Sequence, residues 1–188
     1  MITLAPALSN RHFPRAAGWL RDLLLIITSS LFVAAFAQIE IPLQPVPITG
    51  QTFAVLLVGA TLGSKRGAAS LALYLAEGAL GLPFFAGGAA GLTYVVGATG
   101  GYLIGFIVAA YVIGLLAERG LERSIRTSIL PFLAGTLVIY LFGVSWLAIV
   151  LGSFQKAVAA GLLPFLIGDA IKLAAAAVAL PAAWKLVK

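Results

Sequence analysis

Long apolar windows without charge alternate with short polar segments along this chain. A membrane-spanning helix needs about 20 mainly apolar residues, so each window predicts a helix that crosses a bilayer. Placing a boundary at every polar interruption predicts six spans, the second and third of them short. The spans are residues 21–39, 52–63, 67–82, 100–118, 127–152 and 164–185. We therefore predict an all-α integral membrane protein whose residues 1–188 form a single membrane domain.

Composition supports this interpretation and excludes several kinds of chemistry. Hydrophobic residues make up 62% of the chain and charged residues only 10%, whereas soluble domains are about 25% charged. The chain has no cysteine and one histidine, so thiol chemistry is excluded and a metal site would have few ligands. No histidine cluster or carboxylate dyad is apparent either. The sequence therefore does not indicate an enzyme, and we expect no cofactor.

The basic residues predict the orientation in the membrane. Lysine and arginine accumulate in cytoplasmic loops, and six spans with a cytoplasmic N-terminus leave only Lys156 on the outer side. Both termini are then cytoplasmic. Because the basic residues form small clusters at span ends, we interpret them as orientation signals and lipid contacts, not as a nucleic-acid site. The cytoplasmic set is Arg11, Arg15, Arg21, Lys65, Arg66, Arg119, Arg123, Arg126, Lys185 and Lys188.

The N-terminal segment invites a signal-peptide interpretation because arginines precede the first apolar window. That window is long for a signal peptide and continues into a proline-rich segment without a clear cleavage site. We expect it to be a retained first span. The residues before it are expected to lie at the membrane interface, with Phe13 and Trp19 at headgroup level.

Two outer loops are unusual. Residues 40–51 contain three prolines, and residues 83–101 are rich in glycine. Proline restricts the backbone and glycine allows it to approach a ligand closely, so together the loops resemble a lid. Residues 59–66 only approximate a phosphate-binding loop, because Ser64 replaces its second glycine and Arg66 its hydroxyl residue. Any ATP-driven step would need another chain.

Two opposite charges interrupt the last apolar window. A charge at the bilayer centre costs roughly 2.5–3.5 kcal/mol on insertion scales, so such residues usually face a partner or a cavity. Asp169 and Lys172 are spaced i,i+3 and share one helix face. Near the outer end of their span, below both loops, they predict a ligand site. The alternative is an internal salt bridge or a tie to another helix. Glu77, the other carboxylate within a predicted span, is either a site residue or a structural group.

Residues 37–88, 97–120 and 154–177 together resemble the BioY family, the biotin-binding S-components of energy-coupling factor (ECF) transporters. The resemblance implies a six-helix membrane protein that captures biotin from outside. The family's GD-x-x-K motif corresponds here to Asp169 and Lys172, which the resemblance assigns to the biotin site. An aspartate accepts hydrogen bonds from the ureido N–H groups of biotin, and a lysine donates to a ligand oxygen. We assign Asp169 to the ureido ring.

Further residues are assigned to the substrate site on weaker grounds. Thr49 and Gln51 in the first outer loop are expected to supply polar lid contacts, and Glu77 completes the predicted site. Aromatic side chains of the second loop and the following span would enclose the apolar ring of biotin, although aromatics at membrane ends also form interfacial belts. These aromatic residues are Phe84, Phe85, Tyr94 and Tyr102.

The resemblance also implies partners: a membrane coupling subunit and ATPase subunits, in the cell (inner) membrane of a bacterium or archaeon. S-components contact the coupling subunit through small residues spaced by four, and Ser30 and Ala34 fit this pattern. We predict that they form the docking face. The alternative is a secondary carrier that works without ATPases, as an oligomer, but the sequence shows no convincing inverted repeat.

Overall fold

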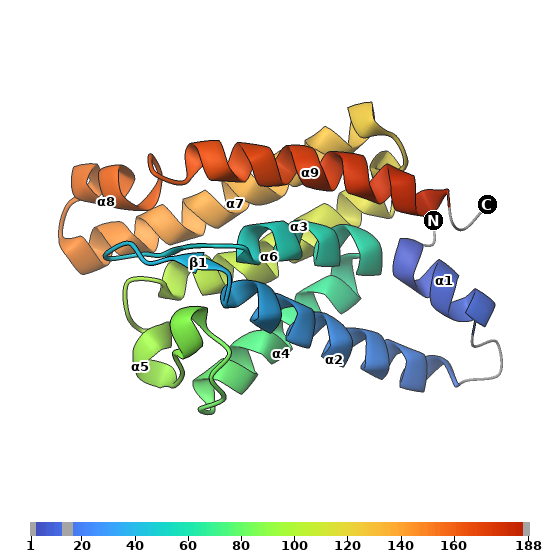
Figure 1. Cartoon of the computed structure of the whole chain (residues 1–188), viewed down its shortest axis with the longest axis horizontal. Helices are drawn as coiled ribbons and strands as arrows, with labels where there is room; N and C mark the ends of the chain where they lie inside the picture. The colour runs from blue at the N-terminus through green and yellow to red at the C-terminus, as the bar shows by residue number, and fades with distance from the viewer. Residues whose placement is uncertain (1–2, 13–16, 186–188) are drawn as a thin grey trace.

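The computed structural model describes residues 3–12 and 17–185 of the chain, with the side chains of Arg11 and His12 also left out. The predicted roles of Phe13, Arg15 and Lys188 concern residues outside this described part. Figure 1 shows an elongated bundle in which most helices run along the long axis.

Helices form at all six segments that the apolar windows predicted, with boundaries within a few residues. Of these, α2, α6, α7 and α9 are long and apolar enough to cross a membrane. The other two, α3 with 12 residues and α4 with 16, are shorter than a typical span. The six helices are α2 (Gly18–Ala37), α3 (Gln51–Leu62), α4 (Ser64–Ala79), α6 (Gly100–Ala117), α7 (Ile125–Leu151) and α9 (Leu166–Trp184).

The connecting segments contain short elements that the sequence did not predict. In the first outer loop, β1 (Glu40–Ile41) and β2 (Ile48–Thr49) pair antiparallel, with Glu40 opposite Thr49. Short helices occupy the remaining connections. They are α1 (Leu4–His12), η1 (Ala86–Gly88), α5 (Leu92–Val95), η2 (Leu121–Arg123) and α8 (Phe154–Gly161).

The N-terminal segment differs in part from the interfacial segment that we expected. Leu4 of α1 is buried, and α1 packs against α3 and α2, so apolar contact within the bundle holds this helix. Trp19, in the first turn of α2, is exposed.

The helices form layers, with α7, α8 and α9 on one side, α2, α4 and α5 on the other, and α3 and α6 between them (Figure 1). At one end of the bundle lie α1, η2 and the last turn of α9; we call this the terminal end. At the other lie the β1–β2 loop, α5 and α8, which we call the hairpin end. The two unusual outer loops of the sequence therefore meet at the hairpin end.

A glycine on α7 allows an aromatic side chain of α6 to lie against it. A Cβ added to Gly143 would be 2.3 Å from the Tyr102 ring, which real packing does not allow. The absence of that Cβ lets the ring pass between α6 and α7, and Tyr102 is buried there. The helix contact thus positions Tyr102 in the interior of the hairpin half.

The turn between α3 and α4 is fixed by the side chain of Glu118, the residue directly after α6. Gly63 adopts φ +85°, a left-handed conformation that glycine tolerates. Beyond it, Glu118 Oε1 accepts hydrogen bonds from Ser64 N at 2.7 Å and from Ser64 Oγ at 2.8 Å. A carboxylate at the first turn also interacts favourably with the dipole of α4. The terminal end of α4 is therefore anchored to α6.

Ser30 and Ala34, the predicted docking residues, are buried in this fold. Ser30 has no exposed surface and Ala34 is 6% exposed, because this face of α2 packs against α4 inside the chain. The Ser30 hydroxyl donates a hydrogen bond to Glu77. Small residues spaced by four allow close helix packing within a chain as well as between chains. In this fold, the small residues spaced by four lie at the contact between α2 and α4 within the chain.

Candidate functional site

The two charges of the last helix form an ion pair inside the bundle. Lys172 Nζ lies 2.8 Å from Asp169 Oδ1, and Asp169 is 5% exposed. Asp169 occupies the first turn of α9, where the positive end of the helix dipole favours a carboxylate. The i,i+3 spacing thus places both groups on one face, as predicted.

Side chains from two other helices complete the network around this pair. The Thr52 hydroxyl of α3 donates to Asp169 Oδ1 at 2.8 Å, and the Tyr140 hydroxyl of α7 donates to Asp169 Oδ2 at 2.6 Å. Lys172 Nζ also donates to Thr52 Oγ1 at 2.9 Å and to the Thr49 carbonyl at 2.7 Å. A buried ion pair is tolerated when its remaining donors and acceptors are satisfied. The pair thus also ties α9 to α3 and α7, as the structural alternative expected.

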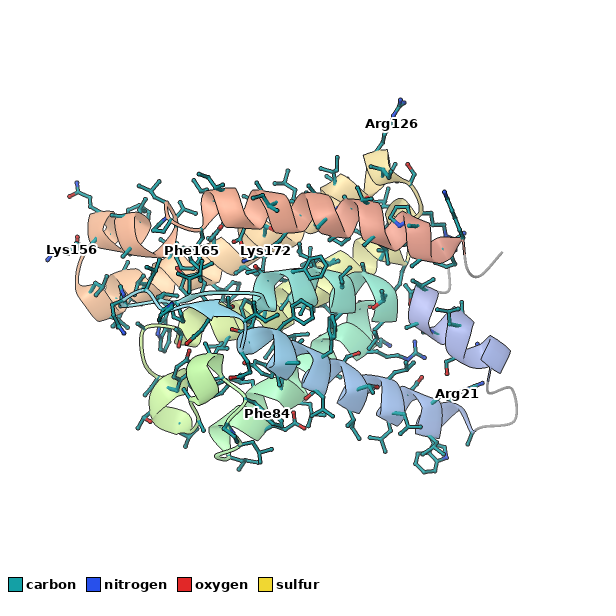
Figure 2. The ribbon with its side chains drawn as sticks, in the orientation of Figure 1. Arg21, Phe84, Arg126, Lys156, Phe165 and Lys172 are labelled. Carbon is teal, nitrogen blue, oxygen red and sulfur yellow. The ribbon has the colours of Figure 1, made fainter. Side chains whose placement is uncertain are left out.

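The network forms one wall of a cavity in the hairpin half. Its empty space, including the open mouth, is about 490 Å³. Val46 and Pro47 from the first outer loop contribute to the wall, and Figure 2 shows Phe165 and Lys172 on the same side of the bundle. The other walls are largely apolar and come mainly from α6 and α7: Leu103, Phe106 and Ile139. The charged pair and the apolar side chains therefore line the same cavity.

Six of the seven predicted substrate-binding residues line this cavity: Thr49, Gln51, Tyr94, Tyr102, Asp169 and Lys172. The seventh, Glu77, does not. Its carboxylate accepts the hydrogen bond of Ser30 between α4 and α2. This geometry favours the structural role for Glu77, which was one of the two roles left open by the sequence.

The polar residues of the first outer loop connect it to the second. The Thr49 hydroxyl donates to Gln51 Oε1 at 3.0 Å, and Gln51 Nε2 donates to the Tyr74 hydroxyl at 2.7 Å. Tyr74 in turn donates to the Phe84 carbonyl at 3.1 Å. The chain of bonds runs from β2 through α4 to the glycine-rich loop. Both loops are therefore held in position over the cavity.

Aromatic rings lie on two sides of the cavity. Tyr102 donates its hydroxyl hydrogen to the Gly161 carbonyl at 2.6 Å, and its ring lies nearly parallel to that of Phe165, with centroids 6.3 Å apart. Tyr94 stacks on Phe85 at 4.9 Å. Burial raises the pKa of Tyr94, so its phenol stays neutral. Phe85 is buried behind Tyr94 and, like Phe84, does not line the cavity.

Sequence reasoning missed several lining residues, most importantly Thr52, Thr99, Tyr140 and Phe165. Tyr140 had a readable signal, because it is a tyrosine in the middle of an apolar window rather than at the interfacial end where tyrosine is common. Thr52 directly follows the TGQ segment in which polar contacts were expected. The other two had no comparable signal.

Comparison with known proteins identifies the family of the chain. The profile of the BioY family matches residues 7–188. The chain is 44% identical over 152 residues to the probable biotin transporter BioY of Pyrococcus horikoshii, covering 79% of this chain and 89% of that protein. It is also 44% identical over 155 residues to the biotin transporter BioY of Thermotoga maritima, covering 81% and 90%.

A solved structure is similar as well. The crystal structure of the S-component for biotin from an ECF-type ABC transporter superposes with a TM-score of 0.74, at 26% sequence identity, covering 88% of this chain and 92% of that one. The resemblance noted in the sequence is therefore confirmed over nearly the whole chain. The chain belongs to the BioY family.

Proposed function

We propose that this chain binds biotin and supports its uptake as the substrate-specific subunit of an ECF-type transporter. The observation that carries the proposal is the Asp169–Lys172 pair, which lies in a hydrogen-bonded network at the wall of a mainly apolar cavity. Relatives named as biotin transporters, and the similar S-component for biotin, identify the ligand class. As a member of a transporter family, the chain is not an enzyme.

Biotin has groups that suit each wall of the cavity. Its ureido ring carries N–H donors, its thiophane ring is apolar, and its valeryl chain ends in a carboxylate. A carboxylate has about four acceptor positions, and Asp169 uses three of them, for Lys172, Thr52 and Tyr140. The remaining position can accept one ureido N–H. Tyr102 and Phe165 would pack against the apolar ring.

Lys172 has a different role in the proposal. An ammonium group has three donors, and all of them are used, by Asp169, Thr52 and the Thr49 carbonyl. To donate to the ligand, Lys172 must exchange one of these bonds. Thr49 and Gln51 remain candidate contacts from the first outer loop, as does Tyr94 from the second.

We further propose six membrane spans in one domain, with both termini cytoplasmic and the hairpin end outside. In Figure 2, Lys156 lies at the end of the bundle opposite to Arg21 and Arg126. This distribution supports the orientation because cytoplasmic ends are richer in basic residues. Such a chain is a multi-pass protein of the cell membrane, of bacterial or archaeal type, with the cavity near its outer face.

The proposed partners are the membrane coupling subunit and the ATPase subunits, which alone would use ATP. The similar structure is the S-component of an ECF-type ABC transporter, which supports this assembly. The surface that meets the coupling subunit needs a new assignment, since Ser30 and Ala34 are buried. The rival is a self-sufficient carrier that acts as an oligomer. Biotin uptake in cells lacking every coupling ATPase would favour that rival.

Calorimetric titration of the purified, detergent-solubilised protein with biotin tests the ligand assignment. We expect the parent to bind biotin tightly and the variants Lys172→Ala and Asp169→Asn to bind it much more weakly. The control variant Lys156→Ala, in α8 and outside the cavity lining, should bind biotin like the parent. All variants must remain monodisperse in size-exclusion chromatography. No binding by a folded parent would refute the biotin assignment. Equal affinity in all variants would leave the pair with a structural role.

A further inference from the structure

A groove at the terminal end lies far from the biotin cavity, between the start of α7 and the end of α9. Its empty space, including the open side, is about 1170 Å³. Three apolar residues, Ile125, Val178 and Pro181, form much of its lining, together with Arg123, Trp184 and Lys185. It is therefore a large hollow with both apolar and basic parts.

The apolar part continues into the exposed surface of the bundle. Val178 is 55% exposed, and Ile171, two turns earlier on the same face of α9, is 66% exposed. Ile129, one turn after Ile125 on α7, is also exposed. In a chain that spans a membrane, such surfaces face acyl chains. The groove thus opens onto the surface that lipid covers.

The basic part is held in place by its surroundings. The Arg123 guanidinium lies over the Trp184 ring, 4.7 Å from the ring centroid, and Arg123 Nε lies 3.7 Å from Glu122 Oε1. These contacts restrict the side chain while leaving it 46% exposed. Lys185 at the end of α9 is exposed in the same groove. Two cations therefore lie beside an indole ring, the side chain that prefers headgroup depth.

No carboxylate in the described part of the chain lines the groove. Glu122, the ion-pair neighbour of Arg123, is fully buried behind it. Lys185 has no such neighbour among the lining residues. The groove is therefore complementary to an anion that carries an apolar chain.

We propose that this groove binds an anionic glycerophospholipid, with the phosphate between Arg123 and Lys185 and an acyl chain against Val178 and Ile125. Basic pockets between helices at the cytoplasmic interface are typical binding sites for acidic lipid headgroups. The groove continues into the lipid-facing surface, as a site for an acyl chain must. A site for a peptide would not need this continuity, so the geometry favours a lipid. The inference does not depend on the biotin assignment.

Lipid retention tests the proposal directly. The protein is reconstituted in vesicles of mixed phosphatidylglycerol and phosphatidylcholine and extracted in mild detergent, and retained lipids are counted by native mass spectrometry. We expect selective retention of phosphatidylglycerol by the parent. Arg123→Gln and Lys185→Gln should each lower it about fivefold and the double variant about twentyfold. Arg126→Gln, in the first turn of α7 but outside the groove lining, and Lys156→Gln should stay within about twofold of the parent.

A steric variant keeps the test independent of Arg123, whose loss also affects the surroundings of Glu122. Ala182→Trp fills the groove without removing a cation, since Ala182 lines it and is exposed, and should lower retention as well. Equal retention of the two lipids would overturn the proposal, as would parent-like retention in the folded Lys185→Gln and Ala182→Trp variants. Displacement of the lipid by glycerol 3-phosphate would overturn it too, by assigning the site to a soluble phosphate.

Discussion

Two buried carboxylates at opposite ends of the bundle differ in their hydrogen-bond partners. In the hairpin half, Asp169 pairs with Lys172 and also accepts hydrogen bonds from Thr52 and Tyr140. At the terminal end, neither oxygen of Glu122 has a hydrogen-bond partner among the described residues, and Arg123 Nε is 3.7 Å away. Burial alone therefore does not mark a ligand site in this chain.

The difference lies in how many elements converge on each group. Donors from α3, α7 and α9 surround Asp169 beside a cavity and satisfy both of its carboxylate oxygens. Glu122 lies in η2, and burial raises its pKa above the ordinary value. The hydrogen-bond acceptors of Asp169 are therefore satisfied by several elements of the fold, whereas burial shifts Glu122 toward its neutral form.

The largest expected effect comes from breaking the ion pair. Asp169→Asn leaves the Lys172 ammonium without its anion, so we expect the free energy of unfolding to fall by about 3 kcal/mol. Replacing both charges, as in Asp169→Asn with Lys172→Met, should restore most of that loss. Chemical denaturation in detergent measures both.

Asp22→Asn is the matched control for this experiment. Asp22 pairs with Arg66 at 2.7 Å, but both side chains are well exposed. Exposed pairs contribute about 0–1 kcal/mol. The variant that combines Asp169→Asn with Lys172→Met decides between two causes of instability. If it is as unstable as Asp169→Asn alone, the unpaired charge is not the cause, and the prediction is wrong.

A smaller effect is expected from removing one hydrogen bond to Asp169. Tyr140→Phe deletes the donor to Asp169 Oδ2, so the carboxylate is oriented less well, and we expect biotin to bind about tenfold more weakly. Tyr111→Phe on the exposed face of α6 is the control and should bind like the parent. Calorimetry measures both affinities. Parent-like binding by Tyr140→Phe would remove Tyr140 from the site.

At the terminal end the prediction concerns stability and pH. The pKa of Glu122 is raised in the folded chain, so its favourable contribution is present at low pH and is lost as the pH rises through the folded pKa. Glu122→Gln removes this titration. We expect the variant to be about 1 kcal/mol more stable than the parent at neutral pH, with a flatter profile of unfolding free energy against pH. Identical profiles would show that folding does not change the pKa of Glu122, which contradicts this prediction.

The smallest effect is expected at a third carboxylate. Glu77 accepts a hydrogen bond from Ser30 and does not line the cavity beside Asp169. Glu77→Gln should therefore change the biotin affinity by less than about twofold. A loss as large as that in Tyr140→Phe would return Glu77 to the ligand site, contrary to the geometry.

The sequence predicted the helices and the charged pair because both depend on local information. Apolar windows identify helices in lipid, and an i,i+3 spacing places Asp169 and Lys172 on one face regardless of the tertiary structure. The polar lid residues Thr49 and Gln51 were also predicted, from a motif in the first outer loop.

The rest of the site depends on how each helix is rotated. The helices α6 and α7 are apolar all around, so no amphipathic pattern indicates which face meets the cavity. Tyr140 and Phe106 were missed for this reason. The contact of Ser30 could not be predicted from the sequence either. Small residues favour close helix packing but do not specify whether the neighbouring helix is in the same chain.

The hydrogen bonds that join α9 to Thr49, Thr52 and Tyr140 also constrain biosynthesis. A helix with two charges inserts poorly by itself, and α9 follows, along the chain, the segments that carry its three polar partners. Those partners are therefore synthesised before it. This order favours the insertion of Asp169 and Lys172 beside groups that can bond to them, and the network is completed only once α9 has been made.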